Sequence, residues 1–130
     1  LKRLAYKGVA YWREDSDVIG KWETKDVWND ESILKFNISD HIGHPGVYFA
    51  VIDQQTGENV LVIEEVLLLQ NGKQISSDKH IGTSIKNSNH NRLYFLDLQT
   101  TSPNASYEIL IKVKGLFGNP SAGKIYLMTP

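Results

Sequence analysis

The stretch ASYEILIKVKG (105–115) decides the fold class, because apolar and polar residues alternate along it. Successive side chains of a β-strand point to opposite faces, so this period of two predicts a strand with one buried face. The residues expected to point inward are Tyr107, Ile109, Ile111 and Val113. The segment SILKFNI (32–38) alternates in the same way.

The segment GVYFAVID (46–53) is apolar on both faces, which predicts a central strand, followed by a hairpin turn at QTGE (55–58). ENVLVIEEVLLLQNG (58–72) is long enough for a helix, but its β-branched residues and its Asn-Gly end favour a strand. The pair Glu64 and Glu65 predicts a bulge or a bend between two sheets. The other expected strands are KGVAYW (7–12), GKWETKD (20–26), RLYFLDL (92–98) and GKIYLMT (123–129).

About eight short strands separated by Gly, Pro, Asn and Asp turns are typical of an all-β protein. We therefore predict an antiparallel β-sandwich or jelly roll. The 130 residues suit a single domain spanning 1–130. Residues 1–6 are expected to be the remnant of a linker, since the chain opens on Leu1 as a processed or excised segment would.

Composition removes several classes of protein. Cysteine is absent, which excludes disulfides and thiolate chemistry. The net charge is −1, with 14 basic and 15 acidic residues intermixed, so no positive patch predicts nucleic-acid binding. No apolar run reaches the roughly 20 residues of a membrane span.

Asp78 and His80 lie in the polar stretch NGKQISSDKHIGTS (71–84) and raise the question of a metal site. Zinc needs three or four ligands, and loop histidines more often bond to the backbone. The other histidines are His41, His44 and His90. The alternative is a structured loop, in which Asp78 and His80 bond to the backbone and Gly82 takes a positive φ. We favour this scaffold role.

Catalytic signals are weak. Ser84 is near His80 only in the sequence, and the chain has no nucleophile elbow. Glu64 and Glu65 are neighbours in a strand, so they point to opposite faces and cannot act as a pair. We expect no catalytic residue, and a small self-contained hydrolase is the least favoured alternative.

Three tryptophans are the candidates for carbohydrate binding, because sugars stack their C–H faces on exposed aromatic rings. They are Trp22, Trp28 and Trp12, in that order. The alternative is that these rings fill the ends of the core. The turns DSD (15–17) and ND (29–30) are candidates for a structural Ca²⁺; no other cofactor is expected.

The order of these segments resembles the C-terminal β-sandwich of secreted bacterial glycoside hydrolases, especially β-N-acetylhexosaminidases of glycoside hydrolase family twenty and some α-L-fucosidases. The resemblance runs from about Lys21 to Leu127, with Thr83-Ser84 where that family often has Thr-Gly. The matching residues are Asn71, Gly72, Asp78, His80, Gly82, Ser121, Gly123 and Ile125.

The resemblance implies a galactose-binding-like fold and a non-catalytic accessory module that binds carbohydrate, packs on its own catalytic domain, or does both. It also implies a bacterial protein that is periplasmic, displayed on the cell surface or secreted. A purely structural domain without sugar binding is the alternative. We expect the isolated module to be a monomer.

Overall fold

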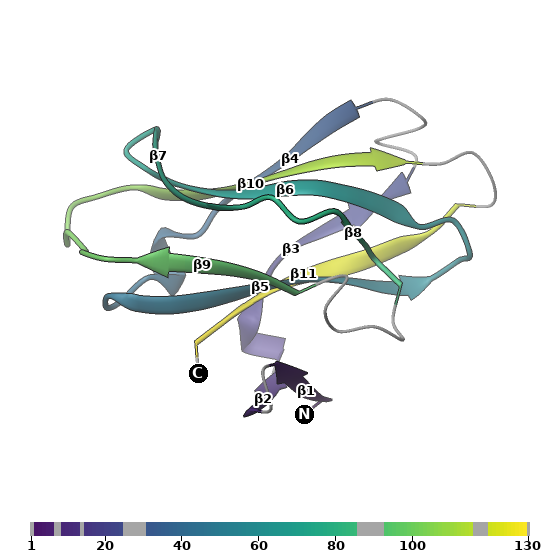
Figure 1. Ribbon diagram of the computed structural model, residues 1–130, viewed down its shortest axis with the longest axis horizontal. Helices are drawn as coiled ribbons and strands as arrows, with labels where there is room; N and C mark the ends of the chain where they lie inside the picture. The colour runs from purple at the N-terminus through teal and green to yellow at the C-terminus, as the bar shows by residue number, and fades with distance from the viewer. Residues whose placement is uncertain are drawn as a thin grey trace.

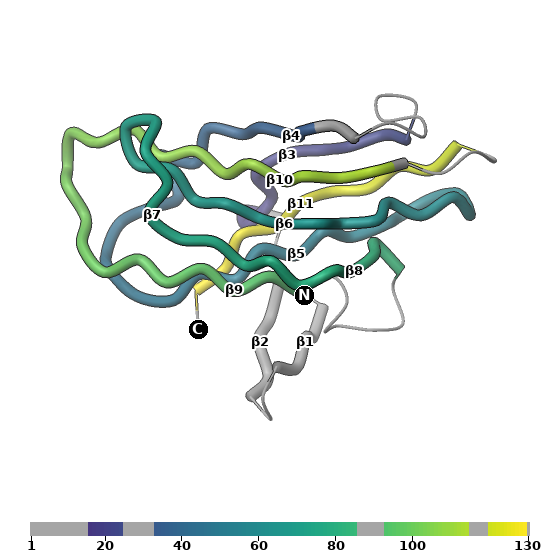
Figure 2. Tube along the Cα trace, turned by 45° about the horizontal axis from the view of Figure 1, so that its top comes forward, coloured from purple at the N-terminus to yellow at the C-terminus, as the bar shows by residue number. Residues whose placement is uncertain are grey.

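The computed structural model describes residues 2–6, 9–13, 15–24, 31–85, 93–115 and 120–129. Two antiparallel sheets pack face to face as the layers of a β-sandwich, which confirms the predicted fold class (Figures 1 and 2). In order across the five-stranded sheet lie β4 (Glu31–Asn37), β10 (Tyr107–Gly115), β6 (Leu61–Gln70) and β7 (Lys73–Asp78), and β8 (Gly82–Thr83) also pairs with β6. The four-stranded sheet has the order β3 (Val18–Glu23), β11 (Ala122–Met128), β5 (Gly46–Thr56) and β9 (Leu93–Leu98).

The remaining elements lie outside these two sheets. Strands β1 (Lys2–Tyr6) and β2 (Val9–Arg13) pair with each other as a separate antiparallel ribbon. Residues 1–6 were expected to be a linker remnant, and residues 2–6 of that segment form β1. Two short 3-10 helices, η1 (Asp15–Asp17) and η3 (Ser39–His41), join strands. Within the described part of the chain, no helix is long and apolar enough to cross a membrane.

The alternation of β10 is confirmed. All four of its inward-facing residues are buried in the main core, whereas Lys112 and Lys114 are exposed. In β4, Leu34 and Phe36 pack against the same core and Lys35 is exposed. Burial of such apolar side chains between two sheets contributes about 25 cal/mol per Å², which is the main stabilising contribution to a sandwich of this size.

Within the segment 58–72, residues 61–70 form strand β6, and its end is a hairpin, as predicted. Asn71 has a φ of 50° and Gly72 a φ of 80°, the positive values that a type I′ turn requires, and this turn joins β6 to β7. The predicted bulge is also present, because Lys112 lies opposite Glu65 while Val113 lies opposite Ile63. Glu64 is therefore the extra residue in β6.

Strand β5 is central, as predicted, but the hairpin expected after it is wrong. β5 pairs with β11 and β9, and the chain at 57–60 crosses to the other sheet before β6 begins. The reason is that both edges of β5 are already paired, with β11 and with β9, so β6 cannot lie beside β5 in the same sheet. Gly57, with a φ of 84°, makes the turn.

Two glycines allow close packing against the four-stranded sheet. A Cβ on Gly123 would lie 1.8 Å from the carbonyl oxygen of Asp53 and 2.8 Å from the ring of Trp22, which lies across the strand. A Cβ on Gly20 would lie 2.2 Å from the ring of Phe36, which reaches over from the other sheet. The Trp22 ring fills the space over Gly123 between strands, and the Phe36 ring fills the space over Gly20 between the two sheets.

Candidate functional site

Asp78 ends β7 and links the two sheets. Its Oδ1 accepts a hydrogen bond from the N–H of His80 at 3.1 Å, and its Oδ2 accepts one from the N–H of Phe95 in β9 at 3.0 Å. Two residues earlier on the same strand, the hydroxyl of Ser76 accepts a hydrogen bond from the N–H of Asp97 at 3.0 Å. Two N–H groups along the edge of β9 are thus capped by side chains of β7, which closes this side of the sandwich.

His80 lies over this link. Its Nδ1 is 2.7 Å from Oδ1 of Asp78, and its ring stacks on Tyr94 with the centroids 4.0 Å apart and the planes at 10°. The Tyr94 hydroxyl donates to the backbone carbonyl of His80 at 3.0 Å. Burial, and secondarily the negative charge of Asp78, raise the pKa of Tyr94 above its usual value, so this hydroxyl stays protonated as a donor.

Gly82 differs from its expected role. Its predicted positive φ is wrong, because the glycines with positive φ in the described chain are Gly46, Gly57 and Gly72. Gly82 is instead extended in β8, where it is buried and pairs with Ile63. Gly82 is therefore a strand residue rather than the residue of a left-handed turn.

The histidines do not assemble a metal site in the described regions. No group of three or more His, Asp or Glu side chains that could hold a metal ion occurs there. The His44 ring lies near Tyr48, with the centroids 6.0 Å apart, and His41 ends η3. Asp17 ends η1, and the turn at 29–30 and His90 lie outside the described residues, so the Ca²⁺ prediction stays a prediction.

The three tryptophans have different outcomes. Trp22 is buried, with 2% of its surface exposed, and its indole N–H donates to the carbonyl of Asp53 at 3.1 Å. A ring so buried has no face open to a ligand, so Trp22 is a core residue and the predicted stacking role does not fit its position. The side chain of Trp12, in β2, and all of Trp28 lie outside the described residues.

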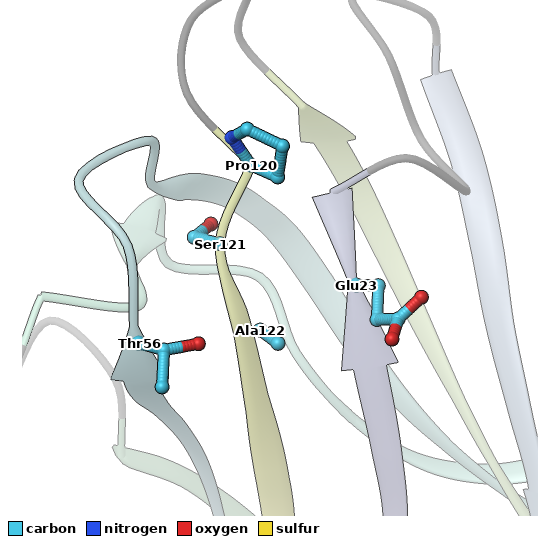
Figure 3. Close-up of a pocket in the computed structure, with 5 residues that line it drawn as sticks. All are labelled: Glu23, Thr56, Pro120, Ser121 and Ala122. Atoms are coloured by element: carbon cyan, nitrogen blue, oxygen red, sulfur yellow. The ribbon is translucent and has the colours of Figure 1, made fainter.

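A surface recess lies at the end of the four-stranded sheet, and no local pattern in the sequence predicts it (Figure 3). Glu23 of β3, Ala122 of β11 and Thr56 of β5 lie directly opposite one another in a single row across three strands. Because Ala122 is small, the larger side chains on either side of it leave an open space above β11. This β11 recess has a volume of about 270 Å³; its lining residues are Glu23, Thr56, Pro120, Ser121 and Ala122.

A second recess adjoins the first at Thr56. It has a volume of about 410 Å³, and Val60 and Ile85 supply apolar surface. We call it the Ile85 recess; its lining residues are Gln54, Gln55, Thr56, Gly57, Glu58, Val60 and Ile85. A pleated-sheet bulge next to Ala122 makes room for Gln55 between the two recesses.

A buried polar network fixes the backbone beneath both recesses. The Thr24 hydroxyl accepts from the N–H of Ser121 at 2.9 Å, which holds the end of β3 against the start of β11. The Ser84 hydroxyl donates to Gln54 at 2.7 Å and accepts from the N–H of Leu61 at 3.0 Å, so it joins the two sheets. A site built on such satisfied buried groups is rigid before any ligand binds.

The β11 recess combines polar and apolar groups. Glu23 and Thr56 are exposed and offer a carboxylate and a hydroxyl, while Pro120 and Ala122 offer apolar surface. Lys21 and Lys124 lie opposite each other two rows further along the same strands. Compared with known proteins, this chain matches no family model and no curated protein.

Proposed function

We propose that this domain is a non-catalytic accessory module of an exported bacterial glycoside hydrolase and that it binds carbohydrate in the β11 recess. The observation that carries the proposal is the row Glu23–Ala122–Thr56, which spaces a carboxylate and a hydroxyl across an apolar floor. A sugar ring presents hydroxyl groups at its rim and C–H groups on its faces, and this arrangement complements both.

The adjoining Ile85 recess extends the site to a second sugar unit. Thr56 lines both recesses and offers a hydroxyl, Gln55 lines the Ile85 recess and offers an amide, and Ile85 and Val60 offer an apolar wall. Trp28 and Trp12 remain the aromatic candidates for stacking. A jelly-roll topology of the galactose-binding type, export to the periplasm or beyond, and a structural Ca²⁺ belong to the same proposal.

The test is a titration of the domain with a panel of mono- and disaccharides, including amino and deoxy sugars, followed by heteronuclear NMR or calorimetry. Ala122→Leu fills the recess and should abolish binding, and Glu23→Gln should weaken it by about tenfold, the effect of losing one hydrogen bond to a charged group. Glu108→Gln, the same change on the other sheet, is the control and should leave the affinity unchanged.

Binding that survives Ala122→Leu would move the site elsewhere on the domain. If no sugar binds to the well-folded domain at all, the result favours the second candidate function, which is a structural module that packs on its own catalytic domain. One observation favours that candidate, since Ile81 and Ile85 on either side of β8 are 67% and 39% exposed. A substitution such as Ile81→Asp should then weaken association with the catalytic domain.

A further inference from the structure

The two open sides of the sandwich are treated differently. On one side, the side chains of Ser76 and Asp78 cap N–H groups of β9, as described above. On the other side, β4 forms the outer edge of the five-stranded sheet, and among the described strands it pairs with β10 alone (Figures 1 and 2). An edge strand carries a row of backbone donors and acceptors that can pair with another strand.

A large apolar side chain lies exposed in the middle of this edge. Ile33 is 57% exposed, although it lies in a strand opposite Lys112 of β10. On the same side of the sandwich, β3 is the edge strand of the four-stranded sheet. Its described residues include no exposed large apolar side chain, because Trp22 is buried and Val18 and Ile19 are half-buried. Ile33 is therefore the large apolar side chain that these two edge strands expose to water.

Charged residues flank Ile33 symmetrically. Glu31 precedes it by two positions and Lys35 follows it by two positions. When an antiparallel strand pair has a two-fold axis at one residue, the residues two before and two after it face each other across the pair. An axis at Ile33 therefore places Ile33 against Ile33 of the second strand, and places each Glu31 opposite a Lys35.

We propose that β4 is a self-association surface and that it pairs antiparallel with β4 of a second copy of this chain, with the two-fold axis at Ile33. The five-stranded sheets of two copies then form one continuous sheet. A second copy of the chain is the partner that fits this edge. When two β4 strands run antiparallel, opposite charges face each other and the apolar residues face each other. Lys35 also lies 3.2 Å from Glu108 in its own chain, and it can contact both carboxylates because its side chain is 59% exposed.

The proposal does not depend on sugar binding, and the experiment contains no sugar. Sedimentation equilibrium of the whole 130-residue chain, over a wide concentration range, measures the monomer–dimer constant. Ile33→Lys should weaken dimerisation by at least about tenfold, because it removes the central apolar pair and adds two like charges. The matched control is Ile75→Lys, at an isoleucine of β7 that is 36% exposed, and it should leave the constant unchanged.

A charge-reversal set tests the register. Glu31→Lys and Lys35→Glu each place like charges opposite one another, so each variant alone should dimerise at least about tenfold more weakly. An equimolar mixture of the two should form a heterodimer, since every facing pair is then of opposite sign. The double variant Glu31→Lys/Lys35→Glu should recover self-association. Glu108→Gln, which removes the ion pair inside one chain, controls for the loss of that contact.

Far-UV circular dichroism of each variant establishes that it is folded, which the exposure of Ile33 and Lys35 favours. Wild-type protein that stays monomeric at the highest concentration overturns the proposal. So does a Lys35→Glu variant that associates more strongly than wild type, since Lys35 would then be a charge that prevents edge pairing. Equal loss of association in Ile33→Lys and Ile75→Lys places the contact on another surface.

Discussion

Replacing Trp22 with Phe tests whether this ring is a structural element of the core. The indole N–H donates to the carbonyl of Asp53, and the ring lies across Gly123 with only 2% of its surface exposed. Loss of the hydrogen bond costs about 1 kcal/mol, and the smaller ring costs a further 1–2 kcal/mol or so in lost apolar contact and residual cavity. We therefore expect the free energy of unfolding to fall by about 2–3 kcal/mol.

The assay is urea unfolding followed by far-UV circular dichroism, with thermal unfolding as the second measurement. A domain of this size should lose roughly 10 °C in its melting temperature, with an unchanged m-value. Below the transition, the folded variant should keep any affinity for sugar, because the ring is not at the surface. A loss smaller than about 0.5 kcal/mol would refute the core assignment, and a loss of sugar affinity in the folded protein would return Trp22 to the binding site.

Three further substitutions probe the contacts between the sheets. Gly20→Ala should lower the free energy of unfolding by about 1–3 kcal/mol, because the new methyl group enters the space held by the Phe36 ring; urea unfolding measures it, and a neutral result would mean that the ring moves aside freely. Asp78→Ala should cost about 2–4 kcal/mol, since it removes a charged acceptor from the N–H of Phe95 and from the loop, and hydrogen exchange at Phe95 should accelerate; unchanged protection would contradict the link. Burial raises the pKa of Tyr94, so the folded state holds this proton when the unfolded state releases it, and stability should decline as the pH rises above about 10. The variant Tyr94→Phe should lack that part of the decline, and identical pH profiles would refute it.

Local pattern was sufficient for several parts of this structure. The alternation of residues 107–113 predicted which side chains enter the core, since a strand repeats every two residues whatever it packs against. Asn71 and Gly72 predicted the hairpin between β6 and β7, because few other residues accept two successive positive φ values. The Glu64–Glu65 pair predicted the bulge, as two charged residues interrupt an apolar run.

Long-range pairing decided the parts where these predictions failed. The turn after β5 has a hairpin composition, yet both edges of β5 pair with strands that are distant in the sequence, β11 and β9. Trp22 lies in a polar stretch typical of a surface loop, but its ring fits over Gly123, a residue about a hundred positions away. No local property of either segment records that contact.

The all-β class, the faces of the strongly alternating strands and the tightest turn follow from local sequence, because each depends on the geometry of a few consecutive residues. The β11 recess and the open edge follow only from long-range pairing. Glu23, Thr56 and Ala122 come from three separate strands and become a row only through the register of β3, β11 and β5. Ile33 is exposed because its side chain faces away from the core, as that of Lys112 opposite it does, and β4 is an edge strand because of how the whole chain pairs.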